Sequence, residues 1–70
     1  MTVQRTFKSV REIPLVITVQ EAAAAMHTSS SGVYRLVASG ELPSFRVGHK
    51  RRIYKRHLLA FMRAHRIRFS

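Results

Sequence analysis

Residues 28–43, TSSSGVYRLVASGELP, decide how the rest of the chain is interpreted, because three consecutive serines stand directly before an amphipathic run. Ser29 has the character of a helix N-cap, whose hydroxyl accepts a hydrogen bond from a backbone amide of the first turn. Apolar residues then recur at the spacing of one helical face: Val33, Leu36 and Val37. Gly40 suits a left-handed C-terminal position, and Pro43 lies just beyond it. The stretch therefore predicts a helix from about residue 30 to residue 39, not a linker.

A shorter helix is predicted directly before this stretch. Thr18 and Glu21 in TVQE have the spacing of a capping box, and the alanine-rich run that follows favours helix. The apolar face of this helix comprises Val19, Ala22, Ala23 and Met26. Only a tight turn fits between Met26 and Ser29. Two short helices joined so closely form an αα corner, which is a helix-turn-helix motif when the second helix enters a major groove.

The segment SFRVGHKRRIY predicts a β-hairpin after the second helix. Phe45 and Val47 alternate with polar residues, which is the period of a half-buried strand, and Ile53 lies on the returning strand. Gly48 supplies the unusual backbone angle at the tip. Basic side chains follow one another there: His49, Lys50, Arg51 and Arg52. Arg46 is expected on the same exposed face of the sheet, so the hairpin resembles a positively charged wing.

The last element is predicted to be a basic amphipathic helix, and the two ends of the chain are assigned to flanking segments. The apolar face of this helix comprises Leu58, Leu59, Phe61 and Met62. It is needed to close a very small core, so core packing is preferred to a membrane-surface location. Residues 17–66 then form one domain. Residues 1–16 form an N-terminal arm that ends in a short extended segment, packed on this domain's own sheet or on a second copy. Residues 67–70 form a basic tail, which is either frayed or a contact surface.

The charge balance indicates a polyanionic partner. Thirteen lysines and arginines oppose three acidic residues, for a net charge of +10. The acids end at Glu41, and only basic charged residues follow it: Arg46, Lys50, Arg51, Arg52, Lys55, Arg56, Arg63, Arg66 and Arg68. Such a one-sided field attracts phosphate backbones, although a merely solubilising surface is the plainer alternative.

Composition argues against several other classes of protein. The chain has no cysteine, no signal peptide and no apolar run long enough to span a bilayer, so we expect a cytoplasmic protein and no membrane partner. Its histidines lie at no i, i+4 spacing to one another: His27, His49, His57 and His65. We therefore expect no metal, no cofactor, no small-molecule substrate and no catalytic residue in a chain this short.

Taken together, the order of these motifs resembles the MerR-like winged helix-turn-helix domains of phage excisionases, also called recombination directionality factors. The resemblance covers residues 17–62 and rests on EAA after the capping threonine, SSSGVYRL, SGELPSFRVG, the basic wing and the closing helix. It departs from the family where the closing helix begins with KRH instead of an acid. The resemblance implies a mainly α fold with a small β-hairpin wing, located with the nucleoid of a bacterial host. It also implies copies on adjacent attachment-region sites that bend DNA and direct an integrase toward excision.

The residues expected to contact DNA fall into two groups. Those of the recognition helix are Ser29, Ser30, Ser31, Tyr34 and Arg35. Those of the wing and its flank are Arg46, His49, Lys50, Arg51, Arg52 and Lys55. Arginine pairs with guanine or phosphate, and serine or tyrosine hydroxyls suit phosphates. Gly32 either keeps the helix backbone near the groove or is an incidental weak point. Two alternatives to an excisionase stay open, namely a small transcriptional regulator and a basic adaptor that recruits a recombinase.

Overall fold

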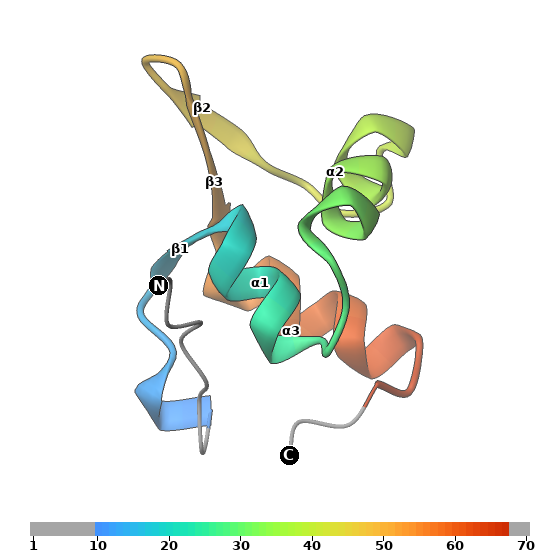
Figure 1. The fold of residues 1–70 in the computed structure, drawn as a ribbon. Helices are drawn as coiled ribbons and strands as arrows, with labels where there is room; N and C mark the ends of the chain where they lie inside the picture. The colour runs from blue at the N-terminus through green and yellow to red at the C-terminus, as the bar shows by residue number, and fades with distance from the viewer. Residues whose placement is uncertain (1–9, 68–70) are drawn as a thin grey trace, which may run out of the picture.

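The computed structural model describes residues 10–67, which form three α-helices and a three-stranded antiparallel sheet (Figure 1). In chain order the elements are the 3-10 helix η1 (Val10–Glu12), β1 (Val16–Thr18), α1 (Val19–Ala25), α2 (Ser30–Ser39), β2 (Phe45–Val47), β3 (Lys50–Tyr54) and α3 (Lys55–Ala64). The predicted fold class, a mainly α winged helix-turn-helix, is confirmed.

The two helices of the corner begin where the sequence predicts. At the start of α1, the Glu21 amide donates to Thr18 Oγ1 at 3.0 Å, and the Thr18 amide donates to Glu21 Oε1 at 2.9 Å. These two bonds complete the capping box. At the start of α2, Ser29 Oγ accepts from the Gly32 amide at 3.1 Å. Both caps satisfy amides that the helix itself leaves without a partner.

All three helices end in the same way, with one left-handed residue followed by a bond that reaches back across the last turn. In α1 the left-handed residue is His27, with φ 56°, and the Thr28 amide donates to the Ala23 carbonyl at 2.9 Å. Gly40 has φ 84° after α2, as predicted, and Arg66 has φ 55° after α3. This pattern is the Schellman motif, which satisfies the last carbonyls of a helix. Two of the three positions therefore hold a side chain where glycine is usual.

The wing belongs to a sheet of three strands in the order β1-β3-β2. Ile17 of β1 pairs with Ile53 of β3, and both are fully buried. The extended segment that was expected to pack on this domain's sheet or on a second copy therefore pairs with this domain's own β3. Of the predicted arm, residues 1–9 lie outside the described residues, and Ile13 is buried in the core. Of the predicted tail, Ile67 packs against the core, and residues 68–70 are outside the described range.

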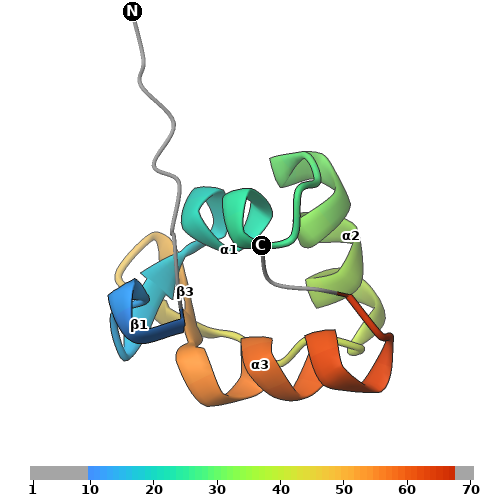
Figure 2. The ribbon, with the colours of Figure 1, turned by 90° about the horizontal axis from the view of Figure 1, so that it is seen from below.

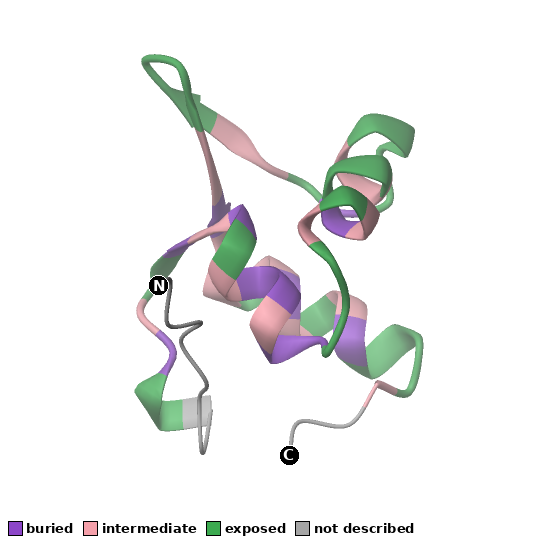
Figure 3. Cartoon of the chain, in the orientation of Figure 1, coloured by how far each residue is buried: buried purple, intermediate pink, exposed green. Residues whose placement is uncertain are grey.

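The core lies between the helices and the inner face of the sheet. Its buried side chains are Ile13, Ile17, Val19, Ala22, Ala23, Ala25, Met26, Val33, Leu42, Ile53, Leu58 and Met62. Figure 2 shows α3 on one side of this core and α1 with α2 on the other. The wing tip projects beyond it and is exposed (Figure 3). Val47, expected to be half-buried, is 58% exposed because it lies at this tip.

Candidate nucleic-acid interface

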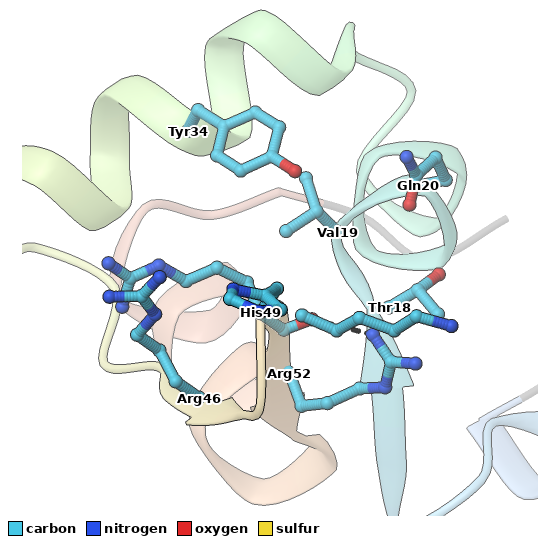
Figure 4. Close-up of a pocket in the computed structure, with 9 residues that line it drawn as sticks. Thr18, Val19, Gln20, Tyr34, Arg46, His49 and Arg52 are labelled. Carbon is cyan, nitrogen blue, oxygen red and sulfur yellow. Dashed lines mark hydrogen bonds between the residues drawn. The ribbon is translucent and has the colours of Figure 1, made fainter.

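A groove of about 530 Å³ opens between the wing and α2, and the beginning of α1 forms part of its wall (Figure 4). The residues that line it are Thr18, Val19, Gln20, Tyr34, Arg46, His49, Lys50, Arg51 and Arg52. Four of these carry a permanent positive charge and none is acidic. Clefts lined by one sign of charge focus the electrostatic field, so this groove favours an anionic ligand.

The basic side chains of the wing are divided between its two faces. The two-residue tip Gly48–His49, with φ 63° at Gly48, sets Val47 opposite Lys50 and Arg46 opposite Arg51. Side chains alternate along a strand, so Arg51 shares a face with the buried Ile53. Arg46 and Arg51 therefore lie on the inner face.

Lys50 and Arg52 alternate with Arg51 along β3 and so lie on the opposite face of the hairpin, and their side chains also line the groove. Arg46 is exposed, and the expectation that it shares a face with the wing cations holds for Arg51 but not for Lys50 and Arg52. The reason is the register that the two-residue turn imposes on β2 and β3.

Hydrogen bonds orient two of the arginines toward the protein itself. Arg51 Nη1 donates to Ser44 Oγ at 3.2 Å, and Arg52 Nη1 donates to the Arg51 carbonyl at 2.9 Å. Each of these guanidiniums has five N–H donors, so most of its donors stay available to a ligand. The directly opposed pair of Arg46 and Arg51 is unfavourable on its own, since like charges repel across a strand pair. Bound phosphates would relieve that repulsion.

α2 contributes one side chain to the groove and presents others beside it. Tyr34 is 47% exposed, and its hydroxyl points into the space between α2 and the wing (Figure 4). Ser31 and Arg35 are exposed on α2 but do not line the groove. Ser30 is half-buried, and the Ser29 hydroxyl is engaged as the helix cap. Ser31 and Arg35 can therefore contact a ligand that extends beyond the groove.

The groove therefore brings together only part of the predicted site. Within it lie Tyr34, Arg46, His49, Lys50, Arg51 and Arg52. Outside it lie Ser29, Ser30, Ser31, Arg35 and Lys55. Lys55 lines a separate pocket, together with Leu15 and Leu59.

Sequence reasoning missed Gln20. This residue is exposed in the first turn of α1 and lines the groove. The sequence does carry a signal for it, since Gln20 lies off the predicted apolar face of α1 and is the second residue after the capping Thr18. Its amide carries both donors and an acceptor, a combination that pairs with adenine in a major groove.

The need for a residue without a side chain at position 32 has a local structural cause. A Cβ atom at this position would lie 2.9 Å from Thr28 Oγ1, in the turn between α1 and α2. The first turn of α2 is therefore small because it packs closely against the preceding turn. This contact accounts for Gly32 without any ligand.

Two further observations on residues 10–67 concern metal binding and membrane spanning. No group of three histidine, cysteine, aspartate or glutamate side chains comes together there as a metal ion would require. No helix in that range has the length and apolar character needed to cross a membrane.

The sequence of the chain is similar to those of known proteins and to one family. The chain is 51% identical over 39 residues to two proteins from strains of Mycobacterium tuberculosis, each named "Putative DNA-binding protein". The match covers 56% of this chain and 50% of each relative, so the chain spans half the length of these curated relatives. No solved structure matches the chain significantly. The family described as "Helix-turn-helix domain" matches residues 16–66, which include both corner helices, the wing and α3. The chain belongs to this helix-turn-helix family.

Proposed function

We propose that the protein binds double-stranded DNA, with α2 in the major groove and the wing along the adjacent minor groove. The observation that carries this proposal is the acid-free groove between α2 and the wing, which gathers four lysine and arginine side chains. Membership of the helix-turn-helix family and the DNA-binding name of both relatives support the same assignment. An α-helix fits a major groove, and arginine is attracted to a narrow minor groove.

Base reading is assigned to residues on α2 and at the start of α1. Arg35 is exposed on α2 and long enough to form a bidentate pair with guanine. Gln20 has the donor and acceptor that adenine requires. Tyr34, which lines the groove, donates its hydroxyl to a phosphate. The wing arginines and Lys50 neutralise phosphates and set the affinity more than the sequence preference.

The finer proposal is that this DNA binding serves prophage excision. A domain of this size covers one short site, so useful affinity requires several copies on adjacent sites. Copies that follow the duplex side by side bend it, and the bend directs an integrase toward excision. The family resemblance of the motifs supports this role over regulation from a single operator, which remains the alternative use of the same contacts.

The test is a gel-shift titration of the full chain on attachment-region DNA and on random DNA of equal length. We expect a ladder of cooperative shifts on attachment-region DNA only. Arg35→Ala should weaken specific binding about tenfold or more, because a bidentate base contact contributes ~1–3 kcal/mol of discrimination. Arg63→Ala is the matched control, since Arg63 is exposed in the last turn of α3 and its loss changes the charge equally.

The outcomes separate the hypotheses. Equal binding to both DNAs, with equal losses in the two variants, would mean that only charge is recognised and would favour the adaptor. A single specific shift without a ladder would contradict the multi-copy excisionase and favour a regulator.

A further inference from the structure

A second pocket lies on another part of the surface and shares no residue with the groove. Its volume is about 490 Å³, and its lining consists of Leu15, Val16, Tyr54, Lys55, Arg56 and Leu59. It is formed where β1, the end of β3 and the start of α3 meet. The proposed DNA interface leaves it unused.

The floor of this pocket is apolar and exposed. Leu15 is 79% exposed and Val16 41%, which makes them two of the few large apolar side chains exposed in the described part of the chain. Tyr54 stacks on Phe45, with ring centroids 4.5 Å apart, so its ring is held in place. Contiguous apolar surface rimmed by polar groups is typical of a protein contact.

The backbone beside the pocket can accept a further strand. Among the described residues, β1 is at the edge of the sheet and pairs with β3 alone. The Lys55 amide donates to the Leu15 carbonyl at 2.8 Å, which makes these two residues a hydrogen-bonded pair. Along an antiparallel ladder, hydrogen-bonded pairs alternate with non-hydrogen-bonded pairs, and Val16 with Tyr54 is the next pair. The amide and carbonyl of Val16 therefore point away from β3 toward the open edge. An extended peptide pairs with such an edge through its main chain.

The charges at the rim select the chemistry of that peptide. The Arg56 guanidinium lies over the Tyr54 ring, 4.5 Å from its centroid. Lys55 and Arg56 occupy the first turn of the ten-residue helix α3, which has no acid there and no side-chain cap. Two cations at the positive end of a helix repel one another and the helix dipole, and carboxylates placed between them relieve this repulsion.

From these features we infer that the pocket binds an extended, acidic segment of a partner protein that also carries apolar side chains. Its apolar side chains cover Leu15 and Leu59, its carboxylates pair with Lys55 and Arg56, and its main chain extends the sheet at Val16. A second copy is a poor occupant because the chain has a net charge of +10. Residues 1–9 of the same chain are also poor occupants, since they include Arg5 and Lys8 and no acid.

A peptide titration of the full-length protein tests this inference. The probe is a labelled nine-residue peptide that alternates leucine and glutamate, and the control peptide alternates leucine and lysine. Amide chemical shifts should move at Val16, Tyr54 and Leu59 with the acidic peptide and not with the basic one. Leu15→Ser should weaken binding about tenfold, as the loss of one covered leucine predicts. Val47→Ser, which removes an exposed apolar side chain at the wing tip, should leave it unchanged.

A second pair of variants tests the charge requirement. Arg56→Gln should weaken the acidic peptide severalfold, whereas Arg63→Gln, on the last turn of the same helix, should not. The inference is wrong if the shifts are confined to the wing arginines, because the peptide would then be acting as a generic anion. It is equally wrong if neither peptide binds, or if Leu15→Ser abolishes self-association in sedimentation, which would assign the pocket to a second copy.

Discussion

At the scale of single residues, the closest contact of the helix corner lies between Thr28 and Gly32. A helix position normally gains stability when glycine becomes alanine, by ~0.5–1 kcal/mol, because alanine restricts the unfolded chain. Here the added Cβ would meet Thr28 Oγ1 at 2.9 Å, which is closer than two such atoms approach. The steric cost therefore opposes the gain in helix propensity.

We expect the effect of Gly32→Ala on the free energy of unfolding to depend on residue 28. In the wild-type background the substitution should lower stability or leave it unimproved. In a Thr28→Ala background, which removes the opposing atom, it should stabilise by ~0.5–1 kcal/mol. Thr28→Val restores an atom of similar size and should restore the penalty. Urea denaturation of the double-mutant cycle measures this coupling, and identical effects in all three backgrounds would contradict it.

The sequence predicted some of these residues better than others. Ser29 as a cap and Gly40 as a left-handed residue follow from local chemistry, and both are confirmed. The left-handed conformation of His27 and Arg66 was not predicted, because residues other than glycine adopt it infrequently. Gly32 was left open for another reason. Its packing depends on a distance across the turn, which no local pattern encodes.

At the scale of elements, α1 depends strongly on Thr18, the residue that caps its N-terminus. It has seven residues, far fewer than an isolated helix needs in water, so capping and packing must hold it together. Its capping box supplies two hydrogen bonds at one end. The beginning of α1 is also part of the groove wall, so the cap helps to position Gln20.

We expect Thr18→Ala to lower the free energy of unfolding by about 1 kcal/mol, which is the usual contribution of an N-cap hydroxyl. Thr18→Ser keeps the hydroxyl and should recover most of this loss. Both variants lose the β-branched methyl of the strand position, so their difference reports the cap alone. Thermal and urea denaturation measure it, and equal stabilities of the two variants would rule out a contribution from the capping box.

Helices were predicted more closely than strands. The bounds of α2 agree with the prediction because a serine cap and a glycine mark its two ends. The partner of β1 could not be predicted, since a three-residue apolar strand fits any edge and its pairing with β3 is distant in sequence. The faces of the wing also depend on register, which a shift of one residue reverses. The expectation that Arg46 shares a face with the wing cations holds only for Arg51 for that reason.

At the scale of the whole molecule, the salt dependence of binding should report how many cations meet phosphates. Each neutralised phosphate contributes about 0.9 to the slope of log K against log salt for duplex DNA. Lys50→Ala, at the exposed wing tip, should therefore reduce the slope by about one unit and weaken binding to all sequences alike. Anisotropy titrations at several salt concentrations measure the slope, with Arg63→Ala as control. An unchanged slope for Lys50→Ala would remove the wing tip from the interface.

The sequence predicted most of the charged groove and not the apolar pocket. The basic residues of the wing follow one another in the sequence, so they are visible without the fold, and most of them line the groove. The apolar pocket joins Leu15 near one end of the chain with Leu59 near the other, so only the folded sheet brings them together. Lys55 was assigned to DNA on its proximity to the wing in sequence, and the fold places it beside that pocket.

The central position of β3 has a mechanical consequence. This strand pairs on both sides and passes directly into α3 at Lys55, without an intervening loop. The base of the wing thus has no loop that could act as a hinge between β3 and α3. A duplex that occupies both the wing and α2 must adopt groove widths that match the distance between them. Flexible pyrimidine–purine steps adopt such shapes at the lowest elastic cost, so the protein should prefer certain sequences even at base pairs that no side chain touches.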